Sequence, residues 1–153
     1  MNILYVCIGN IFRSMSAEYL TKKYLTDNGI ENILVSSVGT TARPEIPFSR
    51  TLERLEFYGC DVSHHQQRKI SPEILAEQDL IICMSEHHRK TVNALGFEAV
   101  LFNEIAYNKT EDLLDDTEYM QINGPDIEID EYVKTIIDYI HEAIPFIVKN
   151  IVK

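Results

Sequence analysis

The sequence has few of the residues that mark fibrous, disordered or disulfide-rich proteins. Only six glycines and five prolines occur among its 153 residues, and 45% of the residues are hydrophobic. This composition excludes a collagen-like, low-complexity or disordered chain. The three cysteines, Cys7, Cys60 and Cys83, form no CxxC pair and no zinc-binding pattern. The sequence therefore predicts neither a disulfide framework nor a structural metal, and it indicates no cofactor.

Basic residues and long hydrophobic runs are also scarce. The 14 lysines and arginines stand against 24 aspartates and glutamates, which gives a formal net charge of −10. Such a chain is poorly suited to general binding of nucleic acids or anionic membranes. The apolar run near the N-terminus is too short for a signal peptide or a membrane span, and no basic stretch precedes it. We expect a cytoplasmic protein. If it binds an anion, a local site must overcome the repulsion from the protein's net negative charge.

The length of the chain predicts a single domain. A chain of 153 residues has the usual size of one domain and can bury a core without cross-links. No internal repeat or linker divides the sequence, so we expect residues 1–153 to form one unit.

Apolar runs and helical patterns alternate along the chain, which is typical of βαβ units. Strands are expected at residues 3–7, 33–38, 80–84 and 99–102. Helices are expected from 14 to a stop at 28–29, from 47 or 48 to 58, from 72, from 85 to 95, and from 129 to 148. Pro145 should kink or fray the last helix, and the polar stretch 108–126 carries no expected element.

Strands separated by helices imply a parallel sheet with helices on both faces, an α/β fold. In open sheets of this kind, ligands bind beyond the carboxyl ends of the strands. The first expected strand ends at Cys7, so we expect the chemistry there.

The segment from Cys7 to Ser14 has the pattern of an anion-binding loop that carries a nucleophile. Gly9 and Asn10 permit a tight turn between the strand and the next helix. Backbone N–H groups at a helix start bind anions, and the Arg13 guanidinium matches two oxygens of a tetrahedral oxyanion. The helix end and Arg13 favour the thiolate form of Cys7, to which Ser14 can donate a hydrogen bond. A thiolate among oxyanion donors predicts a nucleophile that accepts a phosphoryl group.

The spacing of the cysteine and the arginine alone leaves a second interpretation open. A cysteine at the end of a buried strand and an arginine at the start of a helix can stand five residues apart without any function. The strand before the loop, the Gly-Asn pair inside it and the serine after the arginine favour the functional interpretation.

The segment VCIGNIFRSMSAE resembles the N-terminal signature of low-molecular-weight protein tyrosine phosphatases, and residues 36–40, 61–64 and 79–84 resemble later segments of that family. The resemblance implies a flavodoxin-like, three-layer α/β fold with four parallel strands in the order 2-1-3-4. It also implies metal-independent hydrolysis of a phosphomonoester, either in a tyrosine-phosphorylated protein or in a small aryl phosphate. Cys7 is then the nucleophile that forms a cysteinyl-phosphate, and Arg13 clamps the phosphate.

The same resemblance implies the remaining site residues. The phosphate-binding loop comprises Ile8, Gly9, Asn10, Ile11, Phe12, Arg13 and Ser14. Hydrogen bonds that hold this loop are expected from Asn10, Ser14, Ser37 and His64.

Two departures from the family pattern have chemical consequences. Phe12 stands where the family usually has a second cysteine, so Cys7 is expected to lack a partner for a protective disulfide. The family's general acid, an Asp-Pro pair, lies about nine residues before an aromatic residue, which here leads from Tyr132 back to Asn123. An asparagine cannot give up a proton to a leaving phenolate. We therefore expect Asp126, in a reversed Pro-Asp pair, to be the acid, with Asp115 and Asp116 as weaker candidates.

Other interpretations remain open at this point. Asn123 also fits a module that binds phosphorylated anions with weak turnover. The aromatic pair that commonly walls the phosphotyrosine crevice is replaced by Ile127 and Glu128, which leaves the preference for phosphotyrosine open. A thiol-type arsenate reductase needs two further cysteines close together, whereas Cys60 and Cys83 lie far apart in sequence.

Overall fold

The computed structural model describes residues 1–124 and 128–152, apart from the side chains of Asp116, Thr117 and Asn123. Strands and helices alternate as expected through most of the chain. In chain order the elements are β1 (Asn2–Cys7), α1 (Arg13–Asp27), β2 (Leu34–Gly39), α2 (Ser49–Phe57), α3 (Pro72–Ala76), β3 (Leu80–Cys83), α4 (Glu86–Ala94), β4 (Val100–Leu101), α5 (Phe102–Tyr107), α6 (Asp116–Asn123) and α7 (Ile129–Ile151).

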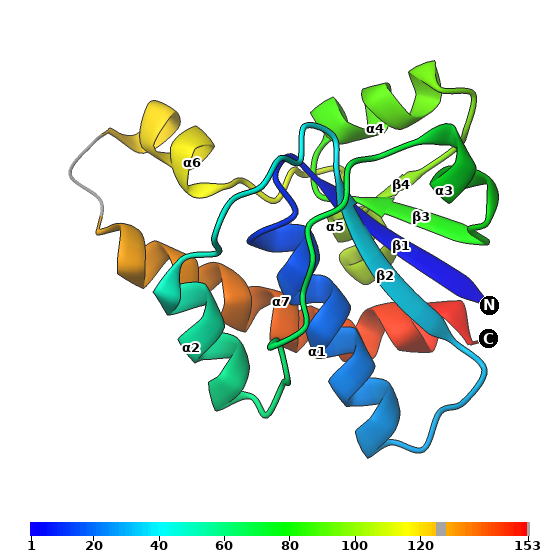
Figure 1. Ribbon diagram of the computed structural model, residues 1–153, viewed down its shortest axis with the longest axis horizontal. Helices are drawn as coiled ribbons and strands as arrows, with labels where there is room; N and C mark the ends of the chain where they lie inside the picture. The colour runs from blue at the N-terminus through cyan, green and yellow to red at the C-terminus, as the bar shows by residue number, and fades with distance from the viewer. Residues whose placement is uncertain (125–127, 153) are drawn as a thin grey trace.

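The four strands form one parallel sheet in the order β2-β1-β3-β4, which confirms the expected topology. Helices α1, α2 and α7 lie on one side of the sheet, and α3 and α4 lie on the other (Figure 1). Burial follows the alternation of side chains along a strand. In β1, Ile3, Tyr5 and Cys7 join the larger apolar cluster, while Leu4 and Val6 join the smaller one on the opposite face. The Cys7 side chain is thereby directed toward the layer that contains α1 and α7.

The chain after β3 differs from expectation. The expected strand at 99–102 is limited to Val100–Leu101, because Phe102 already begins α5. The polar stretch 108–126 contains helix α6, whose N-cap, Asp115, accepts a hydrogen bond from the Glu118 backbone N–H at 2.6 Å. None of the described side chains of α6 is buried, so the sequence has no periodic apolar pattern there. A helix held by its cap leaves little trace in hydrophobic periodicity.

Helix α7 runs to Ile151 and is not ended by Pro145. Buried residues on both sides of the proline, Ile140, Ile144 and Ile147, keep one face of the helix packed on the core. This packing offsets the hydrogen bond that proline cannot donate. Among residues 1–124 and 128–152, no helix is long and apolar enough to cross a membrane.

Candidate active site

The loop between β1 and α1 closes around the sulfur atom of Cys7. Asn10 has a positive φ of 59°, a conformation that asparagine tolerates better than most residues, and its backbone N–H points to Cys7 Sγ at 3.3 Å. The Ser14 hydroxyl lies 2.9 Å from the same sulfur. Cys7 itself is buried, with 2% of its surface exposed. The sulfur therefore lies at the bottom of a loop whose donors face it.

Gly39, at the end of β2, permits this loop to rest on the neighbouring strand. Thr40 N donates to Cys7 O at 2.9 Å, and Thr41 N donates to Ile8 O at 3.0 Å. A Cβ atom on Gly39 would lie 2.4 Å from Ile8 O, closer than real Cβ contacts allow. Glycine is thus required here by the close approach of two backbone segments rather than by an unusual φ angle.

Asn10 is the centre of the hydrogen bonds that hold the loop. Its side-chain N–H groups donate to Ser14 Oγ at 3.0 Å and to Ser37 Oγ at 2.7 Å. Its Oδ1 accepts from the Arg68 backbone N–H at 3.1 Å. Asn10, Ser14 and Ser37 are all buried, so these hydrogen bonds are protected from water and fix the shape of the loop.

The histidine that supports the loop is His65, and the expectation of His64 is corrected. His65 Nε2 donates to Asn10 O at 2.8 Å. His64 is exposed and lines a groove of about 610 Å³ beside the loop. A local turn causes the difference of one residue: Asp61 Oδ1 accepts hydrogen bonds from both Ser63 N and Ser63 Oγ, so His65 faces the loop.

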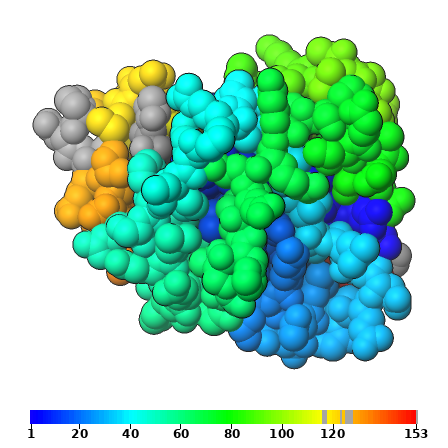
Figure 2. All heavy atoms as spheres, viewed as in Figure 1, coloured from blue at the N-terminus to red at the C-terminus, as the bar shows by residue number. Residues whose placement is uncertain are grey.

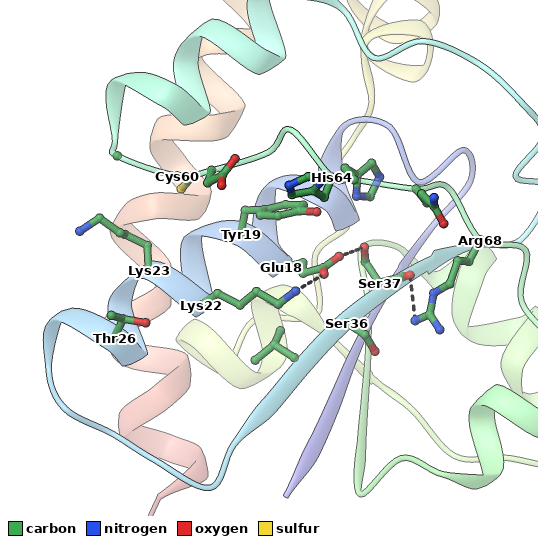
Figure 3. Close-up of a pocket in the computed structure, with 15 residues that line it drawn as sticks. Glu18, Tyr19, Lys22, Lys23, Thr26, Ser36, Ser37, Cys60, His64 and Arg68 are labelled. Carbon is green, nitrogen blue, oxygen red and sulfur yellow. Dashed lines mark hydrogen bonds and ion pairs between the residues drawn. The ribbon is translucent and has the colours of Figure 1, made fainter.

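Sequence reasoning missed Glu18 as a residue that supports the site. Its carboxylate accepts a hydrogen bond from the Ser37 hydroxyl and pairs with Lys22 Nζ at 2.6 Å, as the dashed lines in Figure 3 show. Ser37 in turn accepts from Asn10, so a continuous polar chain runs from Lys22 to the loop. The available clue was that Glu18 is the last residue of the segment that carries the family resemblance.

Arg13 is buried, with 1% of its surface exposed, and it faces the segment before α6. Its Nη1 donates to Leu113 O at 2.5 Å. Its Nη2 lies 3.4 Å from Asp115 Oδ2 and 3.3 Å from Glu118 Oε1. Of the candidates for the acid, Asp115 therefore lies beside the Arg13 guanidinium, whereas Asp126 and the side chains of Asp116 and Asn123 fall outside the described residues.

The other two cysteines have no contact that would make them partners of Cys7. Cys83 belongs to the apolar cluster on the opposite face of the sheet, although its backbone is paired in register with Val6. Burial raises the pKa of Cys60 to about 11 and that of Cys83 to about 12. All three cysteines are free thiols. Burial and a raised pKa both disfavour the reactive thiolate form of Cys60 and Cys83.

The segments that surround the loop leave it little open surface. In the space-filling view, the chain that follows β2 and the chain that precedes α3 meet over the N-terminal region, of which only small areas show between them (Figure 2). In the described parts of the chain, no group of three or more histidine, cysteine or acidic side chains could hold a metal ion. The chemistry offered is that of a thiol, a guanidinium and two carboxylates.

A strand-end cysteine whose sulfur faces a backbone N–H and a hydroxyl, with an arginine at the start of the following helix, is the arrangement of an α/β protein with an anion-binding loop around a thiol. The chain belongs to the low molecular weight phosphotyrosine protein phosphatase family, whose model matches residues 2–151.

The sequence matches to individual relatives cover only part of this chain. The low molecular weight protein-tyrosine-phosphatase Ptp of Acinetobacter johnsonii is 38% identical over 92 residues, which are 60% of this chain and 61% of that protein. The human low molecular weight phosphotyrosine protein phosphatase is 38% identical over 96 residues, 60% of each chain. The chain thus matches about three-fifths of the length of these curated relatives.

Structural similarity extends over the whole chain. A solved structure of YwlE arginine phosphatase, a cysteine-to-serine mutant whose active-site serine is phosphorylated, has a TM-score of 0.84 and 23% sequence identity. The match covers 100% of this chain and 97% of that one. At this level of identity the likeness concerns the fold, which is flavodoxin-like.

Proposed function

We propose that the protein hydrolyses phosphomonoesters, with an aryl phosphate such as phosphotyrosine in a protein as the substrate, through a cysteinyl-phosphate on Cys7. The observation that carries the proposal is the position of Cys7 Sγ, which lies 3.3 Å from Asn10 N and 2.9 Å from Ser14 Oγ in the loop that ends at Arg13. A backbone N–H and a hydroxyl that face a sulfur at a helix start favour binding of an anion beside that sulfur.

Each part of the loop has a role in this reaction. The Cys7 thiolate attacks phosphorus, and the loop N–H groups together with Arg13 bind the equatorial oxygens as charge develops on them. Ser14 Oγ accepts from Asn10 and lies 3.3 Å from Val38 O, to which it donates, and 2.9 Å from Cys7 Sγ. A rotation of the hydroxyl from Val38 O to the sulfur would let its single proton stabilise the thiolate when that thiolate leaves the cysteinyl-phosphate. No metal or cofactor takes part in these steps. Three free thiols suit a reducing compartment, and we place the reaction in the cytoplasm.

Asp115 is the proposed proton donor to the leaving oxygen. Its Oδ2 lies 3.4 Å from Arg13 Nη2, so its carboxyl group reaches the position where the clamped phosphate meets its leaving group. Asp115 is held there because its other oxygen caps α6. This assignment replaces Asp126 as our preferred acid.

Hydrolysis of p-nitrophenyl phosphate by the wild type, Cys7→Ser and Arg13→Ala tests the proposal. Cys7→Ser should abolish turnover but still bind inorganic phosphate, whereas Arg13→Ala should lose both, because the same guanidinium serves the bound phosphate and the transition state. Normal turnover by Cys7→Ser would exclude the mechanism. Binding without turnover in the wild type would instead identify a module that binds phosphorylated anions.

The same assay can define the substrate class. A phosphotyrosine peptide, phenyl phosphate and free phosphoarginine are compared, because one structural neighbour is an arginine phosphatase. Arsenate reduction is measured in parallel. We expect turnover of the two aryl phosphates and no arsenate reduction, since Cys60 and Cys83 are buried.

A further inference from the structure

One nitrogen of Arg13 faces the carboxylates of both Asp115 and Glu118. The mechanism proposed above gives a role to Asp115 alone. Glu118 Oε1 lies 3.3 Å from Arg13 Nη2, and Asp115 Oδ2 lies 3.4 Å from the same atom. The N-cap of α6 fixes this arrangement, because Asp115 Oδ1 accepts a hydrogen bond from Glu118 N at 2.6 Å. The two acidic side chains are therefore held at one place by the backbone of α6.

The surroundings of Glu118 disfavour a second negative charge. Its Oε1 atom is buried and accepts no hydrogen bond from the described residues. Burial raises the pKa of Glu118, the charge of Arg13 opposes this effect, and the charge of Asp115 adds to it. The other titratable groups that face the pair are Tyr132 of α7, whose hydroxyl donates to Leu114 O at 2.8 Å, and the adjacent Tyr119. Arg13 is thus the one cation facing two carboxylates among the charged groups that the structure describes here.

Bound substrate would add further negative charge to a site where one cation already faces two carboxylates. A phosphate dianion bound in the loop would share Arg13 with Asp115 and Glu118, beside the Cys7 thiolate. Two carboxylates this close to each other and to a dianion are not both ionised at moderate cost. A single proton shared by the two carboxylates removes one negative charge at the position where the leaving oxygen needs a proton.

We propose that Asp115 and Glu118 form a pair that holds one proton, with Asp115 as the group that delivers it to the leaving oxygen and Glu118 as the positioning residue that keeps it on the pair. This inference rests on the proposed hydrolase function and deepens it. Glu118 acts through Asp115, and its effect is to keep one proton on the pair beside Arg13.

The proton balances over the two half-reactions. In the first, the Cys7 Sγ–P bond forms, the P–O bond to the leaving group breaks, and the pair gives its proton to the departing oxygen. In the second, water attacks phosphorus and gives a proton back to the pair as the S–P bond breaks. The thiolate and the singly protonated pair are regenerated, and inorganic phosphate leaves.

The test compares pH profiles of kcat/KM for the wild type, Glu118→Gln and Glu111→Gln on two substrates. Phenyl phosphate needs a proton at its leaving oxygen, whereas p-nitrophenolate leaves nearly unaided. The amide of Glu118→Gln can donate to Asp115 and so favours its ionised form. We expect this variant to lose about tenfold on phenyl phosphate near neutral pH, with the alkaline limb moved down by about one pH unit. Its rate on p-nitrophenyl phosphate should change less than about twofold.

Glu111→Gln is the matched control, because it removes one exposed carboxylate four residues before Asp115 and should leave both profiles unchanged. An equal loss on both substrates by Glu118→Gln would indicate a merely structural role. A gain on both substrates with a lower KM would show instead that Glu118 competes with phosphate for Arg13. Either result overturns the inference while leaving the hydrolase function intact.

A binding measurement covers the case in which the wild type binds phosphate without turnover. Calorimetric titration with inorganic phosphate, in two buffers of different ionisation enthalpy, gives the number of protons taken up on binding. The proton uptake of the wild type should exceed that of Glu118→Gln by a measurable fraction of one proton. Equal uptake by the two proteins contradicts the pair, whatever the fate of the hydrolase function.

Discussion

The two walls of the candidate site, which meet at Arg13, are built in different ways. The wall that carries Cys7 is fixed by buried hydrogen bonds between Asn10, Ser14 and Ser37. The second wall consists of the segment before α6 and the start of that helix, from which Asp115 and Glu118 reach Arg13. None of the described side chains of α6 is buried. The proposed nucleophile is thus part of the core, while the proposed proton donor is held against Arg13 by a few polar contacts. We expect damage to the first wall to abolish activity and damage to the second to make it depend on the leaving group.

The largest effect should come from Gly39→Ala, which breaks the first wall without touching a catalytic group. The new Cβ would lie 2.4 Å from Ile8 O and 2.9 Å from Asn10 N, so the loop must move. Displacements of about 1 Å near the reacting atoms cost on the order of 10² in rate. We expect at least this loss in kcat/KM for p-nitrophenyl phosphate.

Gly9→Ala provides the comparison within the same loop. A Cβ on Gly9 meets only side-chain atoms of Ile11, the nearest at 3.4 Å, which is an ordinary contact. Its loss should be clearly smaller than that of Gly39→Ala. Thermal unfolding of both variants separates a displaced loop from a lost fold, and near-normal turnover by Gly39→Ala would contradict the role of the close approach.

The second prediction concerns Asp115, the proposed proton donor in the second wall. Asp115→Asn should slow phenyl phosphate hydrolysis by about 10²–10⁴, the usual contribution of proton donation, and p-nitrophenyl phosphate hydrolysis much less. Asp126→Asn and Asn123→Asp are measured alongside. If Asp126→Asn gave the larger dependence on the leaving group, the acid would be Asp126 as the sequence suggested. Acceleration by Asn123→Asp would indicate that the wild type lacks an acid.

The same contrast explains which parts of the molecule could be predicted from the sequence. The strands and the loop after β1 follow from apolar runs, glycine and a strand-end cysteine, which are local patterns with strong physical causes. The order of the strands came from the family resemblance and is confirmed. The roles of Cys7 and Arg13, which the loop pattern and the resemblance both indicate, stay predictions. All of these lie in or next to the buried core, where the sequence tolerates few alternatives.

The acid wall could not be predicted in this way. Helix α6 is held by a cap at Asp115 and not by an apolar face, so no periodic pattern indicates that Asp115 lies beside Arg13. Counting residues back from Tyr132 led to Asn123 and Asp126, and the assignment of Asp126 stays a prediction. Glu18 and Glu118 were missed because both act through contacts with residues distant in sequence, Ser37 and Arg13. His65 was missed by one position because a local turn at Asp61, and not a periodic pattern, sets its direction.

The third prediction concerns the hydrogen bond from His65 to the first wall. His65→Ala removes the hydrogen bond to Asn10 O, which should cost about 1 kcal/mol of stability and lower kcat severalfold. His64→Ala is the matched control one residue away and should stay within about 0.5 kcal/mol of the wild type, as usual for an exposed side chain. Urea unfolding and p-nitrophenyl phosphate turnover measure the two effects. Equal effects of the two substitutions would remove the distinction between these histidines.

The smallest effect on catalysis concerns His88 of α4, whose contribution is to stability and depends on pH. His88 is fully buried, and its Nδ1 accepts from Ser85 N at 3.2 Å. Burial, with the charge of Arg13 as a further cause, lowers the pKa of His88 to about 3. An unfolded chain takes up this proton near pH 6.5, whereas the folded protein does not until about pH 3. The contribution of neutral His88 to stability is therefore complete above pH 6.5 and is lost as the pH falls through that window.

This linkage gives a slope of about 1.4 kcal/mol per pH unit for a single group well below pH 6.5. The free energy of unfolding, measured in urea between pH 7 and pH 4.5, should fall less steeply for His88→Asn than for the wild type by up to this amount. His87→Asn, at the exposed neighbouring position, should keep the slope of the wild type. Because other groups titrate in the same range, the difference between the variants is what isolates His88. Parallel curves for the wild type and His88→Asn would mean that the His88 imidazole takes up its proton in the folded protein as readily as in the unfolded chain. Water would then reach this side chain, which the structure shows as buried.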